Sequence, residues 1–258
     1  MLLFLLRCRK FVPLYFNSTQ LNNMKIEIWS DVMCPFCYIG KRKFESALNQ
    51  FEHKDQIEIV WKSFQLAPDM VTDSTKNIHE FLAAHKGMTI EQAKGMNNHV
   101  ANMAKQVGLD YNFDKAIPAN SFLAHQFSHL AYKHNLQGQA EEALFKAYFT
   151  DGKNIDDINT LVQIGTEIGL AAYEITNALN DNLYANEVRN DIDEARQIGV
   201  NGVPFFVFDR KVAVSGAQDS SIFLETIENT FAKWSEQNPV PSLKIIDGNS
   251  CSIDNDCN

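Results

Sequence analysis

The 258-residue sequence has few cysteines, no excess of basic residues and no long apolar run. Five cysteines are too few for a fold of this length that is held together by disulfides. Acidic residues outnumber basic ones by 32 to 23, and a net charge of −9 is not that of a nucleic-acid-binding protein. The apolar residues 1–6 fall far short of the about 20 residues that span a membrane. We therefore expect no nucleic-acid partner and no membrane partner.

Residues 1–23 differ in character from the remainder of the chain. Their apolar residues come before Arg7, Arg9 and Lys10, whereas a secretory signal begins with its basic residues. Met24 stands directly before a strand pattern. We interpret residues 1–23 as a leader or an extension from an upstream start, and expect a cytoplasmic protein that begins near Met24. A weak membrane or targeting segment is the alternative.

Two strand patterns flank a closely spaced pair of cysteines. Residues 25–32 alternate between apolar and polar types, and Cys34-Pro35-Phe36-Cys37 follows at once. Residues 40–51 have apolar side chains at helical spacing, and residues 57–66 form a second strand pattern. This order predicts the start of a βαβ unit with the cysteines between its first strand and its helix.

The sequence then turns helical and finally returns to strands. Apolar residues recur at helical spacing in six segments: 90–107, 120–134, 139–149, 155–168, 173–179 and 181–198. Residues 203–208 and 212–215 are strand patterns joined by a turn, and 219–234 is a last helix. We predict an α/β domain formed by residues 24–74 and 199–236. A large all-helical insertion would occupy residues 75–198, and residues 237–258 would form a flexible tail.

The spacing of Cys34 and Cys37 suits thiol–disulfide chemistry. Two intervening residues place both thiols at the first turn of a helix, where the helix dipole stabilises the thiolate of the first cysteine. Pro35 fits that turn because it lacks an N–H group. We therefore expect Cys34 to be the exposed nucleophile and Cys37 the more buried resolving thiol. A zinc site is the alternative, but the spacing of Cys251 and Cys257 is poor for its other ligands, so no metal is predicted.

Two segments carry a resemblance to a known family. Residues Asp31–Lys41 (DVMCPFCYIGK) resemble the active-site segment of the DsbA-like oxidoreductases, specifically their FrnE-like branch. Residues Gly199–Phe206 (GVNGVPFF) resemble the cis-proline loop of that family. The resemblance implies a thioredoxin-like fold with an all-helical insertion. It also implies a cis Pro204 against the cysteine pair, and a Val203 backbone free to pair with an extended substrate.

The implied activity is that of a thiol–disulfide oxidoreductase or disulfide isomerase. Its substrate would be a protein or small molecule that carries a thiol or disulfide, contacted by Pro35, Phe36 and Val203. Phe36 stands where many DsbA proteins have His, which predicts a milder oxidant. No resident cofactor is expected, and we expect a monomer or homodimer. The 2-hydroxychromene-2-carboxylate isomerases and kappa-class glutathione transferases are related, so a glutathione-dependent isomerase or transferase is the alternative. A binding protein with a structural cysteine pair is a third possibility.

Two further features have weaker signals. Cys251 and Cys257 lie in the polar tail and form either an auxiliary redox pair or an inactive part of it. His125 and His129 are four residues apart, like half of a metal site, but Gln126 stands where a metalloprotease helix has Glu. We favour packing or solvent exposure for both histidines.

Overall fold

The structure, a computed structural model, describes residues 23–239, which contain a four-stranded mixed sheet. Its strands are β1 (Met24–Ser30), β2 (Ile57–Ser63), β3 (Phe205–Phe208) and β4 (Val212–Ser215), in the order β2-β1-β3-β4. β1 and β2 are parallel, from the pair Met24–Ile57 to the pair Ser30–Ser63. β3 is antiparallel to both β1 and β4. The predicted βαβ unit and the predicted hairpin are therefore confirmed.

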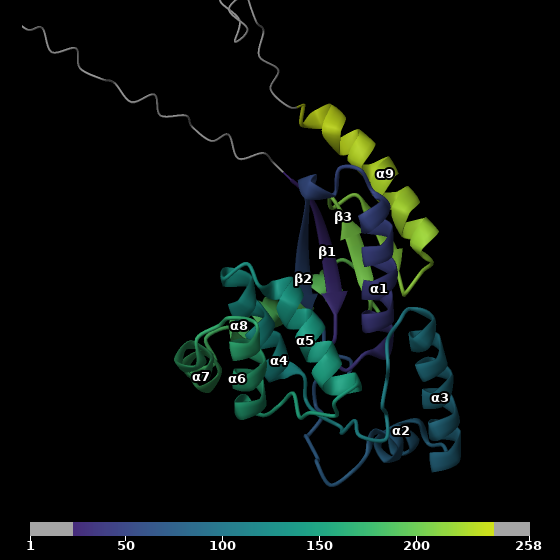
Figure 1. The fold of residues 1–258 in the computed structure, drawn as a ribbon, viewed down its shortest axis with the longest axis vertical. Helices are drawn as coiled ribbons and strands as arrows, with labels where there is room; N and C mark the ends of the chain where they lie inside the picture. Colours follow the sequence, from purple (N-terminus) through teal and green to yellow (C-terminus); the bar gives the residue numbers. More distant parts are fainter. Residues whose placement is uncertain (1–22, 240–258) are drawn as a thin grey trace, which may run out of the picture. The chain divides into compact units, whose positions relative to one another are not determined.

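Helices α1 (Pro35–Gln50) and α9 (Ser220–Gln237) pack against each other beside the sheet (Figure 1). Phe44 of α1 lies at the centre of this packing. Its ring contacts those of Phe206, Phe208 and Phe223, at centroid distances of 5.4, 6.5 and 5.8 Å. Burying these large rings stabilises the packing of α1 on β3 and α9. This packing fixes the direction of α1 relative to the sheet.

Seven helices lie between β2 and β3 in the sequence. They are α2 (Ile78–Lys86), α3 (Ile90–Gln106), α4 (Phe122–Lys133), α5 (Gln137–Phe149), α6 (Ile158–Glu167), α7 (Ala172–Asn180) and α8 (Ala185–Gln197). The six predicted segments match α3 to α8, with ends that differ by a few residues. The helical pattern did not resolve α2 as a separate element. Its signal was a capping box, in which Asn77 and Glu80 each accept the other's backbone N–H.

The helices contact the sheet domain in two groups. α2 and α3 form a hairpin beside α1, whereas α5 and α8 pack on β2 (Figure 1). Asp191 of α8 joins the second group to the sheet, because its carboxylate accepts hydrogen bonds from Lys62 at 2.6 Å and from the Ser63 amide at 3.0 Å. Residues Asn23–Pro239 form one compact unit, and the predicted domain boundaries stay predictions. Within this unit no helix is long and apolar enough to cross a membrane.

Candidate active site

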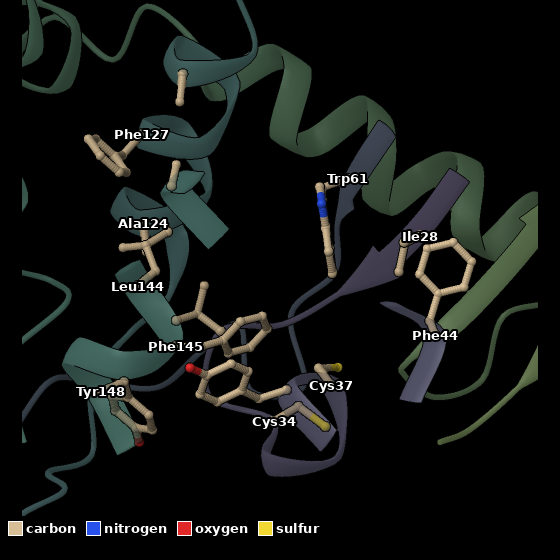
Figure 2. Packing of buried hydrophobic residues seen from close by; sticks show 14 of the residues in the cluster. Ile28, Cys34, Cys37, Phe44, Trp61, Ala124, Phe127, Leu144, Phe145 and Tyr148 are labelled. Atoms are coloured by element: carbon tan, nitrogen blue, oxygen red, sulfur yellow. The ribbon is translucent and has the colours of Figure 1, made fainter. Parts of the chain in front are cut away.

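Cys34 and Cys37 lie at the N-terminus of α1, directly after β1. Cys34 is the N-cap residue, with extended backbone angles, and Pro35 begins the helix. The Cys34 amide donates to the carbonyl of Asp31 at 2.9 Å, and the Cys37 amide donates to the carbonyl of Cys34 at 3.0 Å. Both thiols are free, so the structure shows the reduced dithiol. Figure 2 shows the pair between Phe145 of α5 and the Ile28–Phe44 packing.

The burial of the two thiols differs from the expectation. Cys34 is 4% exposed and Cys37 is 1% exposed, so the prediction of an exposed Cys34 is wrong, although Cys37 is the more buried of the two. Cys34 is buried because residues distant in the sequence pack against it. The Sγ of Cys34 donates to the carbonyl oxygen of Val203 at 3.5 Å, and Met33 and Phe36 line the groove beside it.

The surroundings of the dithiol treat the two sulfurs differently. Burial raises the pKa of Cys37 well above its ordinary value, and contact with Cys34 raises it further. The Ser30 hydroxyl and the Asp31 backbone oppose this effect without cancelling it. Cys37 therefore keeps its proton at neutral pH. Cys34 lies at the positive end of α1, whose first turn contains no acidic side chain.

The segment before β3 forms the second wall of the site. The peptide bond between Val203 and Pro204 is cis, and Pro204 is buried. Its ring packs on Gly40 of α1 so closely that a Cβ atom on Gly40 would lie 2.9 Å from Cγ of Pro204. The Pro204 carbonyl accepts the Gly216 amide at 2.8 Å, which ties this segment to the end of β4. The close packing against α1 thus sets how near Val203 lies to Cys34.

Asp31 holds together the loops around the dithiol. Its side chain is fully buried. One carboxylate oxygen accepts the Met33 amide at 3.2 Å, and the other accepts the Leu66 amide at 2.7 Å. His125 of α4 brings its Nε2 to 3.6 Å from the first of these oxygens. The helical segment and the cysteine loop therefore meet at this carboxylate.

An apolar groove of about 380 Å³ opens beside Cys34. The loop that carries Cys34 forms one side, and helices α2 and α3 form the other. Three of its apolar side chains are well exposed: Phe36 at 39%, Leu66 at 48% and Met96 at 42%. The hydroxyl of Tyr111 donates to the Pro35 carbonyl at 2.7 Å and fixes the rim. The groove offers a site for an apolar group next to the reacting sulfur.

The structure brings together all six of the residues predicted for the site that it describes: Cys34, Pro35, Phe36, Cys37, Val203 and Pro204. Cys251 and Cys257 lie outside the described residues. Of the two outcomes that we favour for the histidines, packing or solvent exposure, the structure shows packing: His125 is 3% exposed, and the side chain of His129 is 14% exposed.

The histidines do not share a site. His125 faces Asp31, whereas His129 lies 3.0 Å from Asp191. Among residues 23–239 no group of three His, Cys, Asp or Glu residues is arranged to hold a metal. Sequence reasoning missed the roles of Asp31 and Tyr111, and of the groove. A polar residue at the end of a strand was the one available signal for Asp31.

Comparisons with known proteins agree with this geometry. Residues 25–228 match the DSBA-like thioredoxin domain. The chain is similar to the uncharacterized protein YwbO of Bacillus subtilis, with 27% identity over 79% of this chain and 96% of the relative. It is also similar to the crystal structure of a probable DsbA oxidoreductase from Streptomyces coelicolor, with 35% identity, 92% and 99% coverage and a TM-score of 0.76. The cytosolic disulfide reductase DsbM of Pseudomonas aeruginosa, solved with GSH, shares the fold at 15% identity, 83% and 98% coverage and a TM-score of 0.55.

Proposed function

Because the chain belongs to the DsbA-like thioredoxin family, we propose that it exchanges disulfides through Cys34 and Cys37. One observation carries the proposal, which is the free dithiol at the N-terminus of α1 with the Cys34 sulfur against the Val203 carbonyl. The positive helix end favours a thiolate at Cys34, and burial keeps Cys37 protonated until it is needed. A two-step exchange requires one thiolate that attacks the substrate and a second thiol that later resolves the mixed disulfide.

In the reducing direction, the Cys34 thiolate attacks one sulfur of a substrate disulfide, and the other substrate sulfur leaves as a thiolate. Cys37 then loses its proton and attacks Cys34 in the mixed disulfide. The second substrate sulfur leaves and takes up a proton. The substrate has gained two electrons, and Cys34 and Cys37 are joined by a disulfide. The oxidising direction is the same sequence in reverse.

The walls of the site support a peptide substrate. Val203 lies before the first residue of β3, where an extended chain can pair with its backbone. Phe36 and Leu66 expose apolar surface beside the sulfur, which suits an apolar residue next to the substrate cysteine. We therefore propose an unfolded or loop segment of a protein as the substrate, Pro35 and Phe36 as its contacts and Pro204 as the residue that holds Val203 in place. We also propose a cytoplasmic location.

The test uses single variants of the full chain in which Cys8, Cys251 and Cys257 are replaced by Ser. Cys34→Ser should abolish the reduction of insulin, because no nucleophile remains. Cys37→Ser should form a mixed disulfide with the substrate and stop there, which intact-protein mass spectrometry detects. Insulin reduction at the full rate by Cys34→Ser would overturn the proposal. A chain that retains Cys251 and Cys257 tests the auxiliary redox pair. Faster turnover by this chain than by the one with Ser at both positions would support that role.

The alternative is glutathione-dependent isomerase or transferase chemistry at the same groove. The isomerases and transferases of that kind usually carry Ser at the position of Cys34, so the thiol in this chain favours disulfide exchange. In disulfide exchange, glutathione would serve as a small reductant of the Cys34–Cys37 disulfide rather than as a bound co-substrate. An isomerase or transferase activity that survives Cys37→Ser, together with tight binding of glutathione, would favour the alternative.

A further inference from the structure

Asp31 places a buried carboxylate in the loop that leads to the nucleophile. Its carboxylate lies against the amide of Met33, the residue directly before Cys34. The side chain is fully buried, so water screens it poorly. A carboxylate at such a position opposes the formation of a second negative charge on a nearby sulfur. An enzyme that depends on a thiolate at Cys34 needs this charge to be compensated.

His125 is the basic group that faces this carboxylate. Its Nε2 lies 3.6 Å from Oδ1 of Asp31, which is too long for a hydrogen bond, and this buried nitrogen has no hydrogen-bond partner among the described residues. Nor does another basic side chain of residues 23–239 come within 4.0 Å of the Asp31 carboxylate. His125 comes from α4 and has no part in the exchange steps described above. A buried histidine whose Nε2 faces this carboxylate is suited to hold a positive charge there.

Other titratable groups surround this pair. Glu141 of α5 also faces His125; it is buried and accepts the Ser128 hydroxyl at 2.6 Å. Lys41 and His129 face Glu141 in turn, and the buried Tyr148 hydroxyl faces Asp31. Burial by itself lowers the pKa of His125, but Asp31, and behind it Glu141, outweigh burial and raise that pKa above its ordinary value. Both carboxylates therefore favour the protonated form of the imidazole.

We propose that His125 is a positioning residue that compensates the charge of Asp31 and so permits a thiolate at Cys34. This role deepens the proposed function and rests on it. His125 keeps its proton throughout the exchange, and the proton that leaves Cys34 goes to solvent. The helical segment thereby tunes the reactivity of a cysteine on another element through one buried ion pair.

The test is the pH dependence of iodoacetamide alkylation at Cys34, in the full chain with Cys8, Cys251 and Cys257 replaced by Ser. His125→Gln should move the midpoint of alkylation to higher pH and slow alkylation at pH 7 by roughly tenfold, because the charge of Asp31 is then left uncompensated. His129→Gln is the matched control: it removes a histidine one turn further along α4 that faces Asp191 instead. Asp31→Asn combined with His125→Gln should return the midpoint toward the original value. Equal midpoints in the original protein and His125→Gln would overturn the proposal.

A second measurement needs no change at His125 and covers the case in which His125→Gln does not fold. Coupling between two charges is reciprocal, so a thiolate at Cys34 must favour the protonated imidazole. The NMR titration of the His125 ring should therefore reach its midpoint at lower pH in Cys34→Ser than in the reduced protein. Identical midpoints would refute the coupling. Failure of the proposed function is distinguishable, because it would appear as insulin reduction that does not need Cys34.

Discussion

Gly40 gives the most direct test of how the site is assembled. It lies within α1, where Ala would normally stabilise the helix by about 1 kcal/mol relative to Gly. A Cβ atom at this position would lie 2.9 Å from Cγ of Pro204 and 3.5 Å from Cβ of Ala217. Ordinary contact begins at 3.4 Å, so α1 and Pro204 must separate by about 0.5 Å. Because Pro204 follows Val203, this shift also moves the carbonyl that contacts Cys34.

Overpacking of a buried site costs about 1–3 kcal/mol, which outweighs the helical gain. We therefore expect Gly40→Ala to lower the free energy of unfolding by about 1 kcal/mol. We also expect it to slow disulfide exchange by about tenfold, since a displacement of 1 Å at a reacting centre can cost about a hundredfold. The assays are urea unfolding and insulin reduction.

Gly95→Ala provides the matched control for this change. Gly95 lies within α3, and a Cβ atom there would meet nothing within 4 Å. This variant should be more stable than the original protein by about 0.5–1 kcal/mol and equally active. If Gly40→Ala were as stable as Gly95→Ala and exchanged disulfides at the original rate, the packing of Pro204 on α1 would not control the site.

Three further predictions concern charge and burial. Burial raises the pKa of Cys37 in the folded protein, so its thiol contributes stability below its ordinary pKa of 9.0, and that stability should be lost as the pH rises above 9.0. Urea unfolding of the reduced protein should show this loss, and reduced Cys37→Ala should lack it. Burial by itself raises the pKa of Glu142, but its hydrogen bonds and ion pairs with α1 outweigh burial and lower that pKa from 4.5 to about 2. The stability that Glu142 contributes is therefore present above pH 4.5 and is lost as the pH falls toward 2. Glu142→Gln should therefore cost about 1–2 kcal/mol at pH 7, after allowance for its partial exposure, and almost nothing near pH 2. Asp191→Ala leaves the buried Ser63 amide without its partner and the Lys62 ammonium with Glu194 alone, and it should cost about 1–3 kcal/mol in urea unfolding. Asp193→Ala on the exposed face of the same helix should cost under about 1 kcal/mol.

Local sequence patterns predicted most of the secondary structure. Within residues 23–239, apolar spacing identified β1 to β4 and all but one of the α-helices, because burial on one side leaves a period of about 2 or 3.6 residues in the sequence. The spacing of Cys34 and Cys37 and the Pro between them predicted a dithiol at a helix N-terminus, which is where both lie. α2 has a short and weak apolar pattern, and its capping residues were the better signal.

The sequence by itself thus determined the order of the elements, the reactive pair and, through the resemblance, the family. Only the tertiary structure decided what surrounds the sulfur of Cys34. Its near-complete burial, the carboxylate of Asp31 against His125, and the groove between the cysteine loop and α2 and α3 all join residues that lie far apart along the chain. Periodicity reports which face of an element is buried, but it carries no information about which distant side chain fills the space opposite. The polar partners of a buried charge are therefore known only once the helices have been packed on the sheet.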